Sequence, residues 1–180
     1  MVSLDAILVK MPDEMLNDAK WYLMQAEEHA ASGATFQLWR EVRATAIFSL
    51  ASIESFINWV AHGYRNQLKH NPEKKEDLSK IEKLISRERN FTLKKKLIKY
   101  ARTITGNDFD KNMIWDEFDE LIDFRNTLVH YKPSVDVYAK STIEMARKYV
   151  KCAQMIIERF YYNWGQPVQP WVNAPYREIR

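Results

Sequence analysis

Apolar residues recur every three or four positions along most of this chain, which is the spacing of one face of an α-helix. The clearest series lies between residues 36 and 68, at Trp39, Val42, Ala46, Leu50, Ile53, Ile57, Val60 and Tyr64. Glycine or proline interrupts the pattern at Pro12, Gly33, Pro72, Gly106, Pro133 and Gly165, where we expect breaks between helical segments. No segment combines strict alternation with β-branched residues and paired turn signals. The pattern therefore predicts an all-α fold.

Four of the predicted helices are long, and they cover residues 13–31, 36–68, 110–130 and 135–164. Two shorter and more charged helices, 76–85 and 92–102, are inserted between the second and third long helices. Because each long helix has a broad apolar face and the connections are short, we expect an up-and-down four-helix bundle. Prolines and aromatic residues near the C-terminus predict an extended tail over the bundle or a partner. The expected organisation is a helical domain over 1–164 and a tail over 165–180.

Composition narrows the class of protein. With 180 residues, 46% of them hydrophobic, the chain can form one domain with a substantial core. A lone cysteine, Cys152, excludes an intrachain disulfide, and the N-terminus lacks a secretory signal, so we expect a cytoplasmic protein. The most apolar stretch, 44–61, barely reaches spanning length and contains Glu54 and Asn58, which favours a buried helix and no membrane partner. Scattered histidines and the lack of a glycine-rich phosphate loop predict neither a metal site nor a cofactor.

Charge is distributed unevenly along the chain. The net charge is +3, yet residues 65–102 hold 13 Lys and Arg against 5 Asp and Glu, whereas residues 107–123 hold 7 acids and one lysine. The first segment is a candidate surface for a polyanion. Its alternative interpretation is a pair of solvated helices whose lysines keep the protein in solution.

Arg125 occupies a position where a core residue is expected. It falls on the apolar line of its helix, which consists of Ile114, Phe118, Leu121 and Leu128. Burying a guanidinium without partners is costly, so Arg125 either meets carboxylates or faces a groove that binds anions. Glu54 and Asn58, which share a face of the second long helix with His62, could receive it. We interpret His62 as part of an ordinary polar surface.

A polar stripe on the same helix ends at His130. Its members, Asp119, Asp123, Asn126 and His130, follow steps of four, three and four residues. His130 lies near the helix end because Pro133 disfavours helical geometry at Lys132. The helix dipole there favours protonated imidazole by about 0.3–1 kcal/mol.

The segment 121–130, with the sequence Leu-Ile-Asp-Phe-Arg-Asn-Thr-Leu-Val-His, resembles the R-x(4–6)-H motif of HEPN domains. The run 49–58 is similar to the Leu/Ala-rich second helix of that family. The resemblance implies a HEPN-type bundle and metal-independent endoribonuclease activity, often in toxins or antiviral effectors. It would make Arg125 and His130 the catalytic pair. The supporting residues would be Asn126, Glu54, Asn58 and Asp123, and the RNA-binding candidates are Lys94, Lys95, Lys96 and Lys99.

A second copy of the motif string, Arg65-Asn66-Gln67-Leu68-Lys69-His70, stands in the same chain. We prefer the copy at 125–130 because it follows an apolar, acid-bearing helix and has Val129 before its histidine. The earlier copy has Lys69 in that place and opens the charged insertion.

The sequence therefore predicts RNA cleavage by 2′-hydroxyl attack, with His130 moving the proton and Arg125 stabilising charge on phosphate. Rival interpretations are a non-catalytic dimerisation module and a nucleotide-binding domain. On a regular helix, residues five apart are about 140° out of phase, so we expect a homodimer to complete the site. Candidate interface anchors are Trp115, Tyr131, Trp164 and Trp171, and an antitoxin protein is a further expected partner by resemblance.

Overall fold

The computed structural model describes residues 4–109, 114–130 and 136–178, and all regular secondary structure in these ranges is helical. The longer helices are α1 (Leu4–Ser32), α2 (Thr35–Lys69), α5 (Ile114–Val129) and α7 (Ile143–Trp164). The shorter ones are α3 (Lys75–Ile85), α4 (Leu93–Thr105), α6 (Val137–Lys140) and α8 (Pro170–Asn173), with 3-10 turns at Pro72–Lys74 and Glu88–Asn90. The all-α prediction and the two inserted helices are confirmed.

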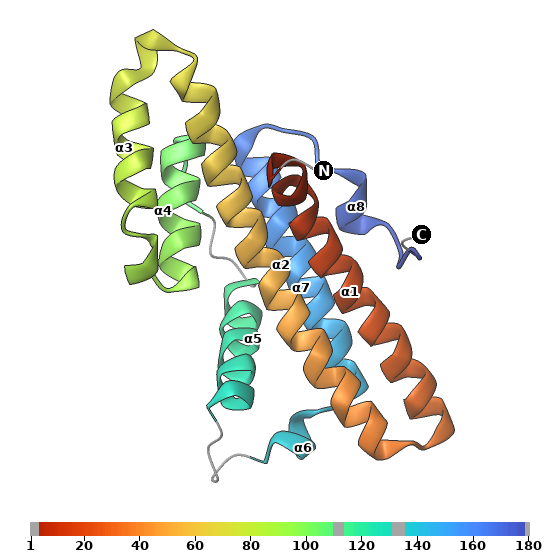
Figure 1. Ribbon diagram of the computed structural model, residues 1–180. Coiled ribbons are helices and arrows are strands. Elements are labelled where there is room, and N and C mark those ends of the chain that lie inside the picture. Colours follow the sequence, from red (N-terminus) through yellow and green to blue (C-terminus); the bar gives the residue numbers. More distant parts are fainter. Residues whose placement is uncertain (1–3, 110–113, 131–135, 179–180) are drawn as a thin grey trace.

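Helices α2 and α7 form the centre of the molecule (Figure 1). Helix α1 packs along both of them on one side, and α5 packs against both on the other. Helices α3 and α4 contact each other and the second half of α2 at the far end (Figure 1). The start of α4 is thereby placed beside α5, and this arrangement creates the site described below.

Apolar side chains from α2, α4, α5 and α7 fill one large core. Phe56 lies at its centre, with its ring edge-on to Phe160 at a centroid distance of 5.5 Å, while Phe124 stacks on Tyr149 at 5.4 Å. Burial of such rings, together with the aliphatic side chains around them, stabilises the bundle through the hydrophobic effect. Trp115, Trp164 and Trp171, which were expected as interface anchors, are partly buried and pack against this core. The fourth anchor, Tyr131, lies outside the described residues.

Helix boundaries follow local capping chemistry, and two of the sequence predictions about them are wrong. The first long helix was expected to begin at residue 13, after a break at Pro12, but α1 begins at Leu4 and Pro12 lies inside it. The predicted helix over 135–164 is interrupted between α6 and α7, where the Thr142 hydroxyl accepts a hydrogen bond from the Met145 N–H at 3.3 Å. An N-cap of this kind starts a helix without any glycine or proline signal. Gly165, with φ of 68°, ends α7 in the left-handed conformation that glycine tolerates.

Helix α2 is long and apolar enough to cross a membrane by length and composition alone. Of its most apolar window, 56% is buried inside the structure, and the core helix of a globular protein passes the same test.

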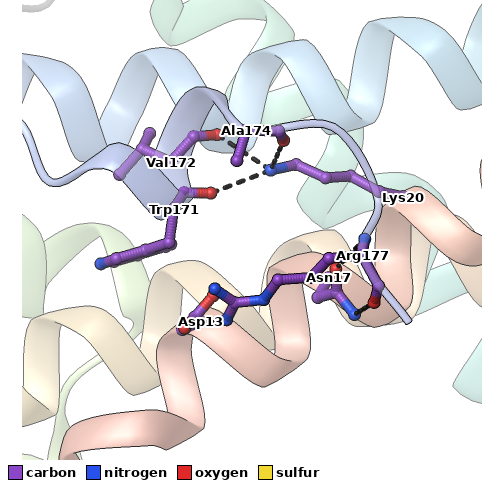
Figure 2. A network of polar contacts seen from close by, with 7 residues as sticks. All are labelled: Asp13, Asn17, Lys20, Trp171, Val172, Ala174 and Arg177. Carbon is purple, nitrogen blue, oxygen red and sulfur yellow. Dashed lines mark hydrogen bonds and ion pairs between the residues drawn. The ribbon is translucent and has the colours of Figure 1, made fainter. Parts of the chain in front are cut away.

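The described part of the tail lies over α1 and α7 and includes the single helical turn α8, which buries Val172 completely (Figure 1). Lys20 of α1 donates hydrogen bonds to the carbonyl oxygens of Trp171, Val172 and Ala174 at 3.0, 3.1 and 2.6 Å (Figure 2). A cation at the C-terminal end of a helical turn satisfies carbonyls that the turn leaves free. Burial lowers the pKa of Lys20 to about 8, so at neutral pH the side chain remains an ammonium that can donate all three bonds.

Two more side chains of α1 hold the end of the tail (Figure 2). Asn17 forms a pair of hydrogen bonds with the backbone of Arg177, donating to its carbonyl and accepting from its N–H, each at 3.0 Å. The guanidinium of Arg177 forms an ion pair with Asp13. We call Asp13, Asn17, Lys20 and the tail atoms that they bind the C-terminal clasp.

Candidate functional site

A groove of about 430 Å³ opens where α2, α4 and α5 meet. Its lining combines apolar and polar side chains: Leu50 and Glu54 from α2, Thr92, Leu93 and Lys94 from the start of α4, and Ile122, Arg125 and Asn126 from α5. Thr92 caps α4 by accepting a hydrogen bond from the Lys95 N–H at 3.4 Å, which fixes where that helix begins. The groove brings together four residues that the sequence singled out, Glu54, Lys94, Arg125 and Asn126.

Arg125 is half-buried on the wall of this groove. Phe118 and Leu121 of the same apolar line are fully buried in the core, whereas Arg125, one turn further on, reaches the opening. Its guanidinium donates to Oδ1 of Asn126 at 3.3 Å, and within the described ranges it has no ion pair with a carboxylate. Of the two expectations for Arg125, the structure fits the one in which it faces a groove.

Glu54 is engaged by a lysine rather than by Arg125. The Lys96 ammonium donates to Oε1 of Glu54 at 3.0 Å. The Lys96 side chain is only 10% exposed, and a cation at that depth requires an anionic partner. Helix α4 packs directly on α2, and this packing places the Lys96 ammonium at Glu54. The expectation that Glu54 forms an ion pair with Arg125 is therefore wrong. The remaining N–H groups of the Arg125 guanidinium can donate to another acceptor.

The four lysines of α4 divide between two sides of the helix. Lys94 lies in the groove, forms an ion pair with Asp119 and holds its ammonium 5.8 Å from the centre of the Trp115 ring. Lys96 is buried at Glu54. Lys95 and Lys99 line a different groove, on the side of α4 that faces α3. The RNA-binding candidates therefore do not form one surface.

Besides Lys95, Lys96 and Lys99, three further candidate residues lie outside the lining of the groove. His130 is exposed just beyond the last residue of α5, and its backbone N–H donates to the carbonyl of Asn126 at 2.8 Å. Asp123 is exposed. Asn58 is half-buried, and its side-chain oxygen has no hydrogen-bond partner among the described residues. Arg125 and Asn126 thus share the groove, and His130 of the same chain does not line it.

The earlier copy of the motif lies at the end of α2. Arg65 donates to Oδ1 of Asn66 at 3.3 and 3.1 Å, much as Arg125 does to Asn126, so that contact does not distinguish the two copies. What distinguishes the second copy is its place on the wall of a groove formed by three helices.

Sequence reasoning missed Thr92 and Leu93, which close the groove at the start of α4. The signal for Thr92 was local, because a threonine directly before an apolar helix is a typical N-cap. Nothing local indicated that this helix start would lie against α2 and α5.

Within the described parts of the chain, no group of three His, Cys, Asp or Glu side chains is placed to hold a metal ion. Cys152 is buried, and burial raises the pKa of its thiol to about 12, which leaves it unreactive near neutral pH. No family model, no curated protein and no solved structure matches this chain. Its function must therefore be argued from the groove itself.

Proposed function

We propose that this protein is a metal-independent endoribonuclease of the HEPN type, with its active site in the groove around Arg125. The observation that carries the proposal is a half-buried guanidinium that faces an open groove without a carboxylate partner among the described residues. An arginine kept only for structure is normally paired, because an unsatisfied guanidinium is costly. A phosphate diester supplies the acceptor that Arg125 lacks.

The chemistry requires two functions, and the sequence supplies both. The 2′-hydroxyl of RNA attacks the adjacent phosphorus, the P–O5′ bond breaks, and the products are a 2′,3′-cyclic phosphate and a 5′-hydroxyl. Arg125 stabilises the additional negative charge on the phosphoryl oxygens, with Asn126 orienting its guanidinium. His130 transfers the proton, since an imidazole ring can accept a proton at one nitrogen and donate one from the other.

A homodimer explains how His130 reaches the reaction. Helices α2 and α5 both line the groove, and each carries an exposed apolar side chain close to its lining residues: Ile47 is 42% exposed one turn before Leu50, and Val129 is 54% exposed one turn beyond Asn126. An apolar surface beside the groove favours burial by another protein surface. A twofold partner covering it would bring a second His130 towards Arg125.

The alternative function is a non-catalytic binding module built on the same groove. The Lys96–Glu54 ion pair favours this alternative, because it shows that part of the polar lining is structural. In that case the groove holds a nucleotide or another anion, and no strand is cut. An antitoxin protein that covers the groove fits either function.

The decisive experiment incubates purified protein with labelled RNA in EDTA and compares the wild type with His130→Ala. We expect cleavage in EDTA by the wild type, products ending in cyclic phosphate, and loss of cleavage in the variant. Cleavage that requires a metal, or that survives in His130→Ala, contradicts the mechanism. Binding of RNA without cleavage under any condition favours the binding module.

The dimer is tested by mixing two inactive variants. If each site takes Arg125 from one chain and His130 from the other, mixed dimers of Arg125→Ala and His130→Ala contain one intact site and recover part of the activity. The alternative is that one chain forms the site by itself after local unwinding at the end of α5. In that case the mixture recovers no activity, and wild-type protein that light scattering shows to be monomeric still cleaves RNA.

A further inference from the structure

Helix α4 lines a second groove on the side opposite the Arg125 groove. This groove, of about 360 Å³, lies between α3 and α4. Its lining consists of Leu84 from α3 and Lys95, Ile98, Lys99, Arg102 and Thr103 from α4. The groove therefore combines an apolar floor, formed by Leu84 and Ile98, with three cations from a single helix.

The three cations have little to neutralise them. Lys95, Lys99 and Arg102 follow steps of four and three, which places them on one face of α4. Lys95 and Lys99 are exposed, and neither has an ion pair with any acid in the described ranges. Arg102 approaches Asp108 at 3.7 Å, but both side chains are about three-quarters exposed, so this contact contributes little. Like charges spaced in this way destabilise a helix slightly.

The other face of α4 shows that unpaired cations are not a general property of this helix. Lys94 and Lys96 each have an acidic partner, Asp119 and Glu54 respectively. The acids thus neutralise the face of α4 that packs on α2 and α5 and leave the face towards α3 positive. Nothing in the packing of α4 requires that second face to be basic.

We propose that the groove between α3 and α4 binds the phosphate backbone of single-stranded RNA and guides it across the start of α4 to Arg125. The identity of the polymer rests on the proposed function; the anion-binding character of the groove does not. Residues four apart on a helix are separated by about 6 Å along its axis, a spacing that successive phosphates of an extended strand can match. The apolar floor accepts sugars or bases, and Phe91, over whose ring Lys99 lies at 5.3 Å, borders the same face.

A continuous polyanion fits the two grooves better than an acidic protein segment does. Thr92, Leu93 and Lys94 line the first groove, and Lys95, Ile98 and Lys99 line the second, so both open on the same short stretch of α4. A strand with one negative charge at every residue can occupy both grooves at once. An acidic peptide that binds only in the α3–α4 groove does not reach the Arg125 guanidinium, which lies on the other side of α4.

Binding is measured separately from cleavage with a fluorescein-labelled 2′-O-methyl oligoribonucleotide, which lacks the attacking hydroxyl. Fluorescence anisotropy at several salt concentrations compares the wild type with Lys95→Glu/Lys99→Glu. The matched control is Lys140→Glu/Lys151→Glu, which makes the same charge change at two exposed lysines on α6 and α7. We expect the test variant to bind at least about tenfold more weakly and its salt slope to fall by about 1.4, since each phosphate contact contributes about 0.7.

Each outcome bears on the proposal. Equal losses in test and control variants indicate unspecific attraction and overturn it, as does an unchanged affinity of Lys95→Glu/Lys99→Glu. Lys95→Arg/Lys99→Arg should bind like the wild type because it keeps both positive charges, and a loss in that variant contradicts the proposal. Polyglutamate that binds with the same affinity and the same dependence on these residues shows that the groove takes an acidic protein instead. If the wild type cleaves RNA and Lys95→Glu/Lys99→Glu binds as tightly as the wild type, this inference is wrong and the proposed function stands. If binding depends on Lys95 and Lys99 but no RNA is cleaved, the proposed function is wrong and this inference stands.

Discussion

The C-terminal clasp and the groove around Arg125 are both built from polar side chains on long helices, yet they use them in opposite ways. In the clasp, the Lys20 ammonium donates to three carbonyl oxygens and Asn17 forms two hydrogen bonds with Arg177. In the groove, Arg125 has one long hydrogen bond with its neighbour Asn126. Satisfied polar groups stabilise a fold, whereas unsatisfied ones at an opening are available for a ligand. Substitutions in the clasp should therefore affect stability, and substitutions of Arg125 should affect function.

The largest effect on stability is expected for Lys20→Ala. The change removes an ammonium from three carbonyls at the end of α8, and we expect the free energy of unfolding to fall by about 2–4 kcal/mol. Urea denaturation measures the change. Lys20→Met keeps most of the side-chain packing, so a similar loss in that variant attributes the effect to the hydrogen bonds. A loss below about 0.5 kcal/mol in both variants contradicts the role of the clasp.

A smaller effect is expected for Asn17→Ala, which removes the two hydrogen bonds to the Arg177 backbone. We expect a loss of about 1–2 kcal/mol and faster amide exchange in residues 174–178. Gln25→Ala on the same helix is the control, because among the described residues the Gln25 side chain forms a hydrogen bond only with Glu28, at 3.1 Å. Equal losses in the two variants would show that the tail is held by Val172 and not by Asn17.

An intermediate effect is expected for Lys96, which lies behind the groove and pairs with Glu54 of its lining. Lys96→Met removes the ion pair with Glu54, whose side chain is 49% exposed, so solvent screening limits the expected loss to about 0.5–1 kcal/mol. Thermal unfolding at low and high salt measures it, and the difference between wild type and variant should shrink as salt rises. A loss above about 3 kcal/mol would place Glu54 and Lys96 among the buried structural pairs.

The smallest effect on stability is expected for Arg125→Ala. Because Arg125 has no acidic partner in the described chain and lies at an opening, the free energy of unfolding should change by less than about 0.5 kcal/mol. The measurement is urea denaturation under the conditions used for Lys20→Ala. A loss comparable to that of Lys20→Ala would make Arg125 a structural residue and remove the contrast between the two regions.

The two regions also differ in how far the sequence predicts them. Helix α2 was predicted almost to the residue, because its apolar period of three to four follows from a single buried face. The position of Arg125 on an apolar line likewise predicted a groove or an acidic partner. Whether Arg125 pairs with Glu54 or faces an open groove depends on Lys96, which binds Glu54 from 42 residues further along the chain. No local sequence pattern encodes that contact.

The clasp was missed for the same reason. Asp13, Asn17 and Lys20 follow steps of four and three on α1, so a polar stripe was visible at helical spacing. The partners of Lys20 and Asn17 are backbone atoms 151 to 160 residues further along the chain, and backbone carbonyls leave no trace in a sequence. The break before α7 was missed because a threonine cap, unlike glycine or proline, is also tolerated inside helices.

The central claim, that Arg125 is free for phosphate, is tested most directly by measuring RNA cleavage in EDTA by the wild type, Arg125→Ala and Arg125→Lys. We predict that both variants lose at least about 100-fold in rate while keeping the wild-type free energy of unfolding, since a lysine ammonium cannot replace the two-pronged guanidinium. Cleavage at the wild-type rate by either correctly folded variant would contradict the account.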